Sequence, residues 1–170
     1  TGLITTNGYA IENDLFSDGE LLSFMDGKEK RLFEDDLKRF VCWYSLAVNR
    51  YLAGVNSAFR THPNKILDDS DGYISLTALQ EGEEYPEELY NLILGSYGAL
   101  LRGKSLFALL LRRLSAKNRV VKFSAKQLMA ICASRKGRNY QALCVAIERE
   151  LNAQQLKLSS RGGTPVLSTV

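Results

Sequence analysis

The chain has 170 residues, of which 45% are apolar and 24% are charged. This composition suits one globular domain, or one domain with a small appendage, that can bury a hydrophobic core. No stretch approaches the roughly 18 apolar residues of a membrane-spanning helix, and no secretory signal opens the sequence. We therefore expect a soluble, cytoplasmic protein without a membrane partner.

Cysteine and histidine content excludes two common kinds of small domain. The three cysteines, Cys42, Cys132 and Cys144, form no CxxC pair, and an odd number argues against a disulfide framework. We expect reduced thiols in apolar faces. The single histidine, His62, has no Cys or His near it in the sequence, which excludes a zinc site of the usual kind.

The net charge of +3 conceals a strong asymmetry along the chain. Residues 1–101 contain 8 Lys and Arg against 17 Asp and Glu, whereas residues 102–170 contain 14 against 2. Two readings remain open. The halves can attract each other within the molecule, or the basic half can present a surface to phosphates.

The first 100 residues predict a short strand followed by helices. Residues 2–6 resemble a strand, and a capping-box pattern at Ser17 and Glu20 predicts a helix from about Asp18 to Met25. Apolar spacings of three and four then predict a long amphipathic helix over 29–57. The next segment, 60–85, has no periodicity and is expected to be irregular.

The remaining sequence predicts further helices and a mixed C-terminal segment. Helices are expected at 86–94 and 100–114. A strand at 119–123, helices at 125–133 and 140–155, and a hairpin at 156–170 follow the order of a winged helix, although other α+β domains share that order. We expect an α+β, predominantly α-helical fold, with one unit at 1–116 and a basic one at 117–170.

Two short motifs carry a family resemblance. The first is TNGYAIEN, with Thr6, Asn7, Gly8, Tyr9, Ile11, Glu12 and Asn13 as the matching positions, and the second is RGKSL, with Arg102, Gly103, Lys104 and Leu106. Over residues 3–116 the chain resembles the later part of a bacterial family of Toprim-like domains. This family occurs in phage-defence and ATPase-associated proteins and is related to the overcoming-lysogenization-defect nucleases.

The resemblance implies a Mg²⁺-dependent nuclease that is incomplete in this sequence. Glu12 would be a catalytic residue and metal ligand, and Lys104 would be a catalytic residue that stabilises the transferring phosphoryl group. The other Toprim carboxylates, a glutamate and a D-x-D pair, would precede Thr1. An ATPase or a second copy of the chain is the expected protein partner. Without the resemblance, Glu12 is read as a residue that hydrogen-bonds local backbone, and Lys104 as the polar side of an apolar helix.

Basic residues of the second half are candidates for contact with nucleic acid. They are Arg112, Arg113, Arg135, Lys136, Arg138 and Arg161. In a winged helix, the turn around residue 136 and the hairpin tip lie near the DNA backbone; a solvated basic surface is the alternative.

Three functions remain open from the sequence. The first is part of a Toprim-like nuclease or defence effector. The second is a non-catalytic DNA-binding or interaction module with a winged-helix end. The third is a helical domain that assembles through its opposite charges.

Overall fold

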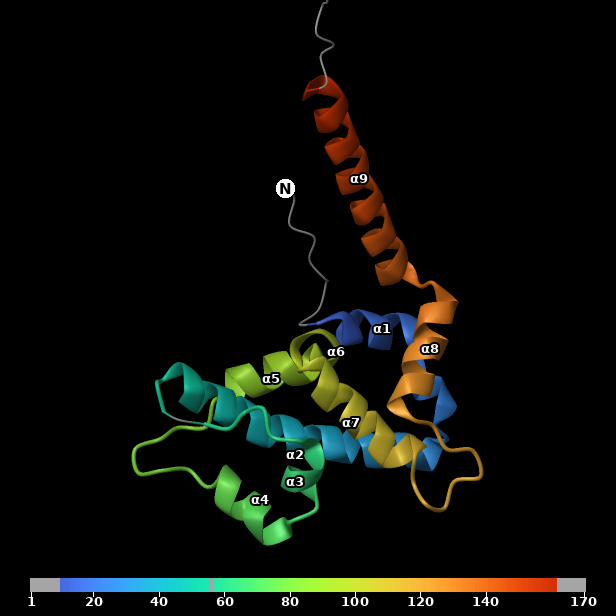
Figure 1. Cartoon of the computed structure of the whole chain (residues 1–170). Coiled ribbons are helices and arrows are strands. Elements are labelled where there is room, and N and C mark those ends of the chain that lie inside the picture. Colours follow the sequence, from blue (N-terminus) through green and yellow to red (C-terminus); the bar gives the residue numbers. More distant parts are fainter. Residues whose placement is uncertain (1–9, 56, 162–170) are drawn as a thin grey trace, which may run out of the picture.

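The computed structural model describes residues 10–55 and 57–161, with side chains described as far as residue 156. Within these ranges every regular element is a helix and there is no strand (Figure 1). In chain order the elements are α1 (Ile11–Gly19), the 3-10 helix η1 (Leu21–Phe24), α2 (Gly27–Leu52), α3 (Pro63–Leu67), α4 (Ser70–Thr77), α5 (Glu87–Gly95), α6 (Tyr97–Leu100), α7 (Gly103–Leu114), α8 (Ala125–Arg135) and α9 (Arg138–Arg161). The expected predominance of helix is confirmed for the described residues.

The long amphipathic helix is confirmed as α2. It begins at Gly27 because Asp26 caps it: the Asp26 carboxylate accepts a hydrogen bond from Glu29 N at 2.8 Å, and the Glu29 carboxylate accepts one from Asp26 N at 3.1 Å. It ends at Leu52, shortly before Gly54, whose φ of 80° favours glycine.

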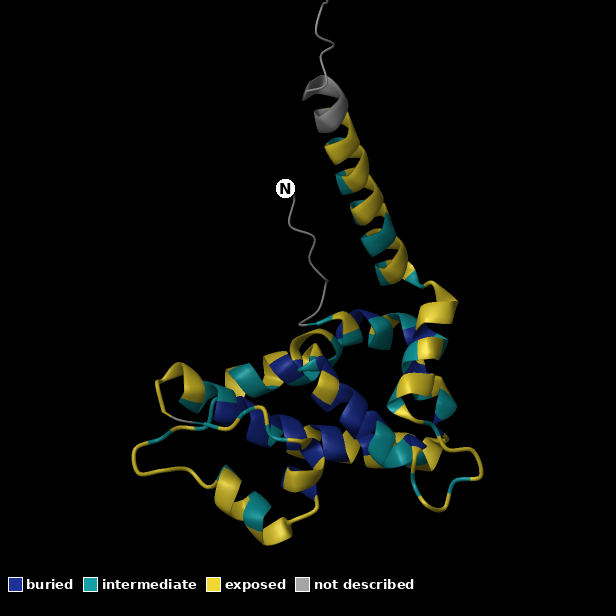
Figure 2. Ribbon diagram, in the orientation of Figure 1, coloured by how far each residue is buried: buried dark blue, intermediate teal, exposed yellow. Residues whose placement is uncertain are grey.

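The hydrophobic core lies between α2 and α7, which cross the centre of the molecule (Figure 2). The side chains that are almost wholly buried there come from one face of each helix: Phe33, Phe40 and Val41 from α2, and Leu106, Leu109, Leu110 and Leu114 from α7. Burial of one such side chain contributes roughly 1.5–3 kcal/mol. The core therefore holds α7 firmly and fixes where its N-terminus lies.

Helix α1 anchors the two C-terminal helices. A β-carbon added to Gly19 would lie 2.3 Å from Cys132 Sγ, so glycine allows α8 to pack closely on α1. The Asp18 carboxylate accepts hydrogen bonds from Asn139 N at 3.0 Å and from Tyr140 N at 2.8 Å, which caps the N-terminus of α9. From this anchor α9 projects away from the rest of the molecule (Figure 1).

The prediction of a helix from Asp18 to Met25 is wrong. Helix α1 begins earlier, at Ile11, where the side chain of Asn13 accepts a hydrogen bond from Ala10 N at 3.0 Å. The chain then turns at Glu20, whose φ of 45° ends the helix. The capping-box pattern misled because Ser17 lies inside the last turn of α1 and Glu20 ends that helix, so neither residue stands at a helix start.

The prediction of an irregular segment at 60–85 is also wrong in part. It contains α3 and α4, both too short to show helical periodicity. The His62 ring Nδ1 accepts a hydrogen bond from Asn64 N at 3.2 Å at the start of α3, and the Asp69 carboxylate accepts one from Gly72 N at 2.9 Å at the start of α4. These caps allow two short helices to form in a polar sequence.

The predicted strand at 119–123 is a loop. Arg119 ties it to the body, donating to Glu29 at 2.8 Å and to Phe24 O at 3.0 Å, while Val120 is fully exposed. No neighbouring strand of the described chain is present to pair with its backbone.

The predicted C-terminal hairpin is wrong where it can be compared. Residues 156–161 continue α9 because the preceding sequence is rich in good helix formers. Residues 162–170 and the predicted strand at 2–6 lie outside the described residues. The order expected of a winged helix is therefore absent from the described chain. The unit boundary between 116 and 117 stays a prediction.

No helix among the described residues is both long and apolar enough to cross a membrane.

Candidate functional site

The described part of the first motif, from Ala10 on, meets the second motif, about 90 residues later in the sequence, at the N-termini of α1 and α7. The link is the side chain of Asn13, which is 1% exposed. Its amide nitrogen donates to Gly98 O at 2.7 Å and to Leu101 O at 2.8 Å. Asn13 therefore satisfies two carbonyls just before α7 and holds α1 beside it.

Gly103 permits the closest contact between the two segments. A β-carbon added at this position would lie 2.5 Å from Glu12 Cβ and 3.1 Å from Asn13 Oδ1. Such a separation is far below van der Waals contact, so any other residue would push α1 and α7 apart. Glycine is therefore required at the centre of the Arg-Gly-Lys motif because a side chain there would collide with Glu12.

An open cavity of about 300 Å³ lies where these segments meet. Its lining consists of Ala10, Glu12, Arg60, Arg102, Gly103 and Lys104. Three basic side chains and one carboxylate thus converge from three separate segments of the chain. Arg102 is also held in place, since it donates a hydrogen bond to Arg60 O at 3.0 Å.

The first turn of α7 adds to the positive character of this cavity. No side chain caps α7, and Gly103 and Lys104, its first two residues, line the cavity. The N–H groups at a helix start and the helix dipole both favour an anion. In the described part of the chain, neither Glu12 nor Lys104 takes part in an ion pair. The predicted catalytic pair therefore lines one cavity.

The residues present do not fit a complete magnesium site. Among residues 10–55 and 57–161, no three His, Cys, Asp or Glu side chains lie close enough together to hold a metal ion. Glu12 is the single carboxylate in the cavity lining, and the other three charged side chains there are basic and repel a divalent cation. Nearby Asp14 is buried and does not line the cavity. The metal role of Glu12 stays a prediction.

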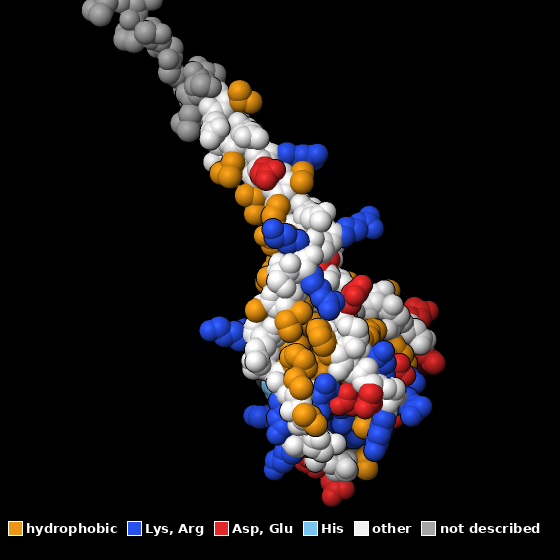
Figure 3. Space-filling model, turned by 90° about the vertical axis from the view of Figure 1, so that its right-hand side faces the viewer, with side chains coloured by type: hydrophobic (Ala, Val, Ile, Leu, Met, Phe, Trp, Pro, Cys, Tyr) orange, Lys and Arg blue, Asp and Glu red, His pale blue; other side chains and the backbone are white. Residues whose placement is uncertain are grey.

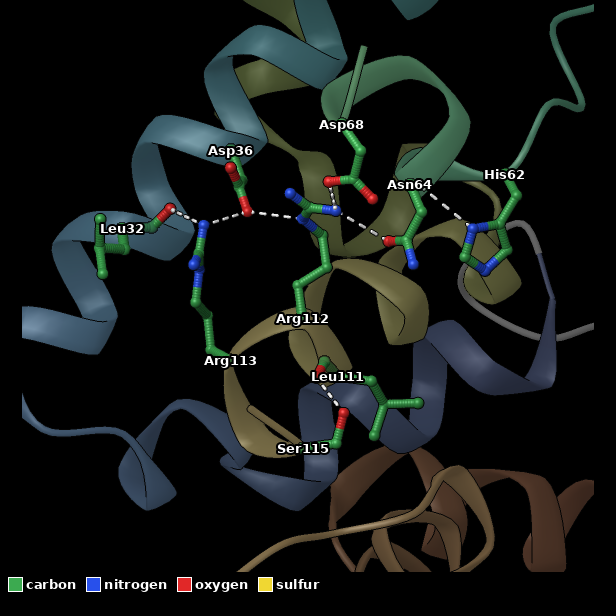
Figure 4. A network of polar contacts seen from close by, with 9 residues as sticks. All are labelled: Leu32, Asp36, His62, Asn64, Asp68, Leu111, Arg112, Arg113 and Ser115. Atoms are coloured by element: carbon green, nitrogen blue, oxygen red, sulfur yellow. Dashed lines mark hydrogen bonds and ion pairs between the residues drawn. The ribbon is translucent and has the colours of Figure 1, made fainter. Parts of the chain in front are cut away.

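Arg112 and Arg113 lie in a polar network between α7 and the acidic half of the chain (Figure 4). Arg112 donates to Asp36 at 2.8 Å, to Asp68 at 2.7 Å and to Asn64 at 2.9 Å. Arg113 also donates to Asp36. Both guanidinium groups are thus occupied within the chain, and their predicted contact with nucleic acid stays untested.

The other predicted basic residues surround the junction of α8 and α9. Arg135 donates to Gly19 O at 2.6 Å and lies over the ring of Phe24, so it helps to dock α8. Lys136 is exposed on the turn that follows, and Arg138 is exposed at the first residue of α9. The side chain of Arg161 lies outside the described side chains. Arg135, Lys136 and Arg138 do not line the Glu12 cavity.

Sequence reasoning missed Arg60. It lies in the segment between α2 and α3, next to Phe59, whose ring it covers at 5.4 Å. Nothing in the local sequence distinguishes it from other surface arginines, because only the tertiary fold brings it to Glu12 and Lys104.

Comparisons of the chain with protein-family models, curated proteins and solved structures found no match. The Toprim-like resemblance consequently rests on the motif residues alone.

Proposed function

We propose that the chain binds nucleic-acid phosphates in the cavity formed by Glu12, Arg60, Arg102 and Lys104, as the later part of a Toprim-like nuclease or defence effector. The observation that carries the proposal is the convergence of these four side chains from three segments of the chain. Three of them, Glu12, Arg102 and Lys104, belong to the motifs that carry the resemblance.

The chemistry of the cavity suits a phosphodiester. Arginine guanidinium groups form paired hydrogen bonds with phosphate oxygens, and a lysine supplies a compact charge. The uncapped start of α7 adds backbone N–H groups with the same preference. Glu12 opposes an anion unless its charge is offset, and the three nearby cations offset it.

We assign no catalytic step to these residues. In a Toprim enzyme, Mg²⁺ stabilises the charge that develops on phosphate oxygens and activates water. Glu12 would serve there only if residues outside the described part of the chain, or outside this sequence, supplied the other ligands. The binding proposal stands without that metal.

A protein-interaction module is the second candidate, and a different observation favours it. Helix α9 projects from the body and carries exposed apolar side chains. The winged-helix form of this alternative is not proposed, because the described residues lack its strands.

Fluorescence anisotropy with labelled single-stranded DNA, duplex DNA and RNA tests the proposal. We expect binding at low ionic strength. The logarithm of the binding constant should fall linearly with the logarithm of the salt concentration. Lys104→Ala should weaken binding and reduce the salt slope by about one. Glu12→Gln should tighten binding, since it removes a negative charge from the phosphate site. Lys38→Ala, which removes an exposed lysine on α2 outside the cavity lining, is the matched control.

The proposal fails if no nucleic acid binds at low ionic strength. It also fails if Lys104→Ala and Lys38→Ala have the same effect, because any binding would then reflect general positive charge. A Mg²⁺-dependent gain in affinity that Glu12→Gln abolishes would support the metal role of Glu12.

A further inference from the structure

A second and larger cavity adjoins the phosphate cavity of the proposed function. It lies between α3, α7 and α8, and its volume of about 470 Å³ is that of a typical small-ligand site. Lys104 lines both cavities. A molecule whose phosphate contacts Lys104 in the first cavity can therefore reach into the second one.

The floor of this larger cavity is apolar and comes mainly from α7. The residues that line it from one face of α7, at spacings of three and four, are Lys104, Phe107, Leu111 and Ser115. This face extends over roughly 16 Å at the rise of an α-helix. Phe107 is only 3% exposed because its ring belongs to the core, so the floor is rigid. Met129 of α8 closes the opposite side.

Hydrogen-bonding groups surround this apolar floor (Figure 4). His62 Nδ1 accepts a hydrogen bond from Asn64 N at 3.2 Å, so the neutral ring carries its proton on Nε2, which can donate. Asn64 Oδ1 accepts from Arg112 at 2.9 Å, and the Asn64 amide nitrogen points away from Arg112. Ser115 Oγ donates to Leu111 O at 2.6 Å, which leaves its oxygen as an acceptor. The cavity thus offers donors and an acceptor beside apolar walls.

We propose that this cavity takes one unstacked base of a single-stranded nucleic acid whose phosphate binds at Lys104. The inference rests on the proposed function and names its substrate class. A nucleobase has apolar faces and an edge of hydrogen-bond donors and acceptors. Its faces contact Leu111 and Met129, whose thioether packs favourably against aromatic rings. Its edge meets His62 and Asn64.

A cavity of this kind selects single strands. In a duplex each base is paired and stacked, so a base enters the cavity only at the cost of both interactions, whereas the bases of a single strand are accessible. The surrounding surface suits a charged strand. On the face that carries α8, hydrophobic side chains have lysine and arginine side chains on both sides (Figure 3). Lys122 and Lys126 are exposed beside the start of α8.

Fluorescence anisotropy with three matched oligonucleotides tests the proposal: a base-bearing single strand, an abasic strand of the same length and a duplex. We expect the base-bearing single strand to bind about fivefold to tenfold more tightly than the abasic strand. An abasic strand that binds equally tightly would overturn the base site and leave phosphate binding intact. A duplex that binds more tightly than the single strand would also overturn it. Absence of binding by all three would overturn the proposed function as well.

Filling the cavity provides a second test. Ala125, the half-buried first residue of α8, lines the cavity, so Ala125→Leu should reduce the affinity for the base-bearing strand to that for the abasic strand. Ala130→Leu is the matched control, because Ala130 is exposed on the same helix and lies outside the lining. Lys104→Ala should weaken both strands alike. Circular dichroism verifies that the variants fold. Equal effects of the two leucine substitutions would overturn the proposal.

Discussion

The Asp36 carboxylate on α2 accepts a hydrogen bond from Arg112 Nε on α7 at 2.8 Å (Figure 4). Asp36 also pairs with Arg113, and its side chain is only 8% exposed. Two arginines of the basic half thus neutralise one buried acid of the acidic half. The pair joins the two helices that form the core.

Replacement of Asp36 should be costly. Removing one member of a fully buried ion pair costs about 3–5 kcal/mol, and here the arginines keep some solvent contact, so we expect Asp36→Ala to lower the free energy of unfolding by about 2–3 kcal/mol. Asp35→Ala, at the exposed neighbouring position, should change it by less than about 0.5 kcal/mol. Urea unfolding followed by circular dichroism measures both. Equal losses would show that the ion pair is not a stabilising contact.

Asn13 should matter for stability rather than for binding chemistry. Asn13→Ala leaves the Gly98 and Leu101 carbonyls without their hydrogen-bond donor, and we expect a loss of about 2–3 kcal/mol of unfolding free energy. Glu12→Ala changes the adjacent motif residue and should leave stability nearly unchanged. Thermal unfolding of the two variants separates the roles. A larger effect from Glu12→Ala would contradict this division.

Gly103→Ala should disturb the contact between α1 and α7. Its β-carbon would lie 2.5 Å from Glu12 Cβ, so one helix must shift, at a cost of about 1–3 kcal/mol. A β-carbon on Gly95, at the end of α5, meets nothing within 4 Å. Gly95→Ala should therefore be neutral or stabilising by up to about 1 kcal/mol. Differential scanning calorimetry of both variants is the measurement, and a stable Gly103→Ala protein would refute the close approach.

Substitutions at Ser17 and Asp18 test which of the two residues caps a helix. The sequence pattern predicted Ser17, whereas in the structure Asp18 caps α9. Asp18→Ala should cost about 1 kcal/mol and reduce the hydrogen-exchange protection of the first turns of α9. Ser17→Ala should have little effect, although the sequence pattern made Ser17 the expected cap. The reverse ranking would favour the helix start that the sequence predicted.

Acid should weaken the contact between Arg50 and Glu83. The hydrogen bond from Arg50, at 2.6 Å, lowers the pKa of Glu83 from 4.5 to about 2. Because the folded pKa is the lower one, the contribution to stability is complete above pH 4.5 and is lost as the pH falls toward 2. Solvent screening limits it to about 1 kcal/mol. Unfolding free energies of Glu83→Gln and the wild type should converge over this range; a constant difference would contradict the pKa shift.

Periodicity and capping patterns were sufficient for several elements. The positions of α2, α5, α7, α8 and most of α9 follow from apolar residues at helical spacing, and this signal is local. The loop at 119–123 was missed because Val120 and Val121 have a strand-like composition but no partner strand. Local sequence does not encode whether such a partner exists.

In the candidate site too, local sequence identified some residues and only the fold identified others. The motifs pointed to Glu12 and Lys104, while Arg60 joined them only through the fold. The charge asymmetry was visible in the sequence, but the sequence did not show which of these charges pair with each other within the molecule. Contacts of Arg112 with Asp36, Arg119 with Glu29 and Arg135 with Glu20 show that part of it is satisfied within the molecule.

By itself the sequence determined the predominance of helix, although not the absence of strands from the described residues, together with the core faces of the longer helices and the opposite charges of the two halves. These properties depend on residue type and on spacing within one element. The tertiary structure decided which carboxylate caps α9, which arginines are occupied by Asp36 and which side chains surround Glu12. Such contacts join residues far apart in the chain, and only the packing of α1 and α2 against α7 and α8 brings them within hydrogen-bonding distance.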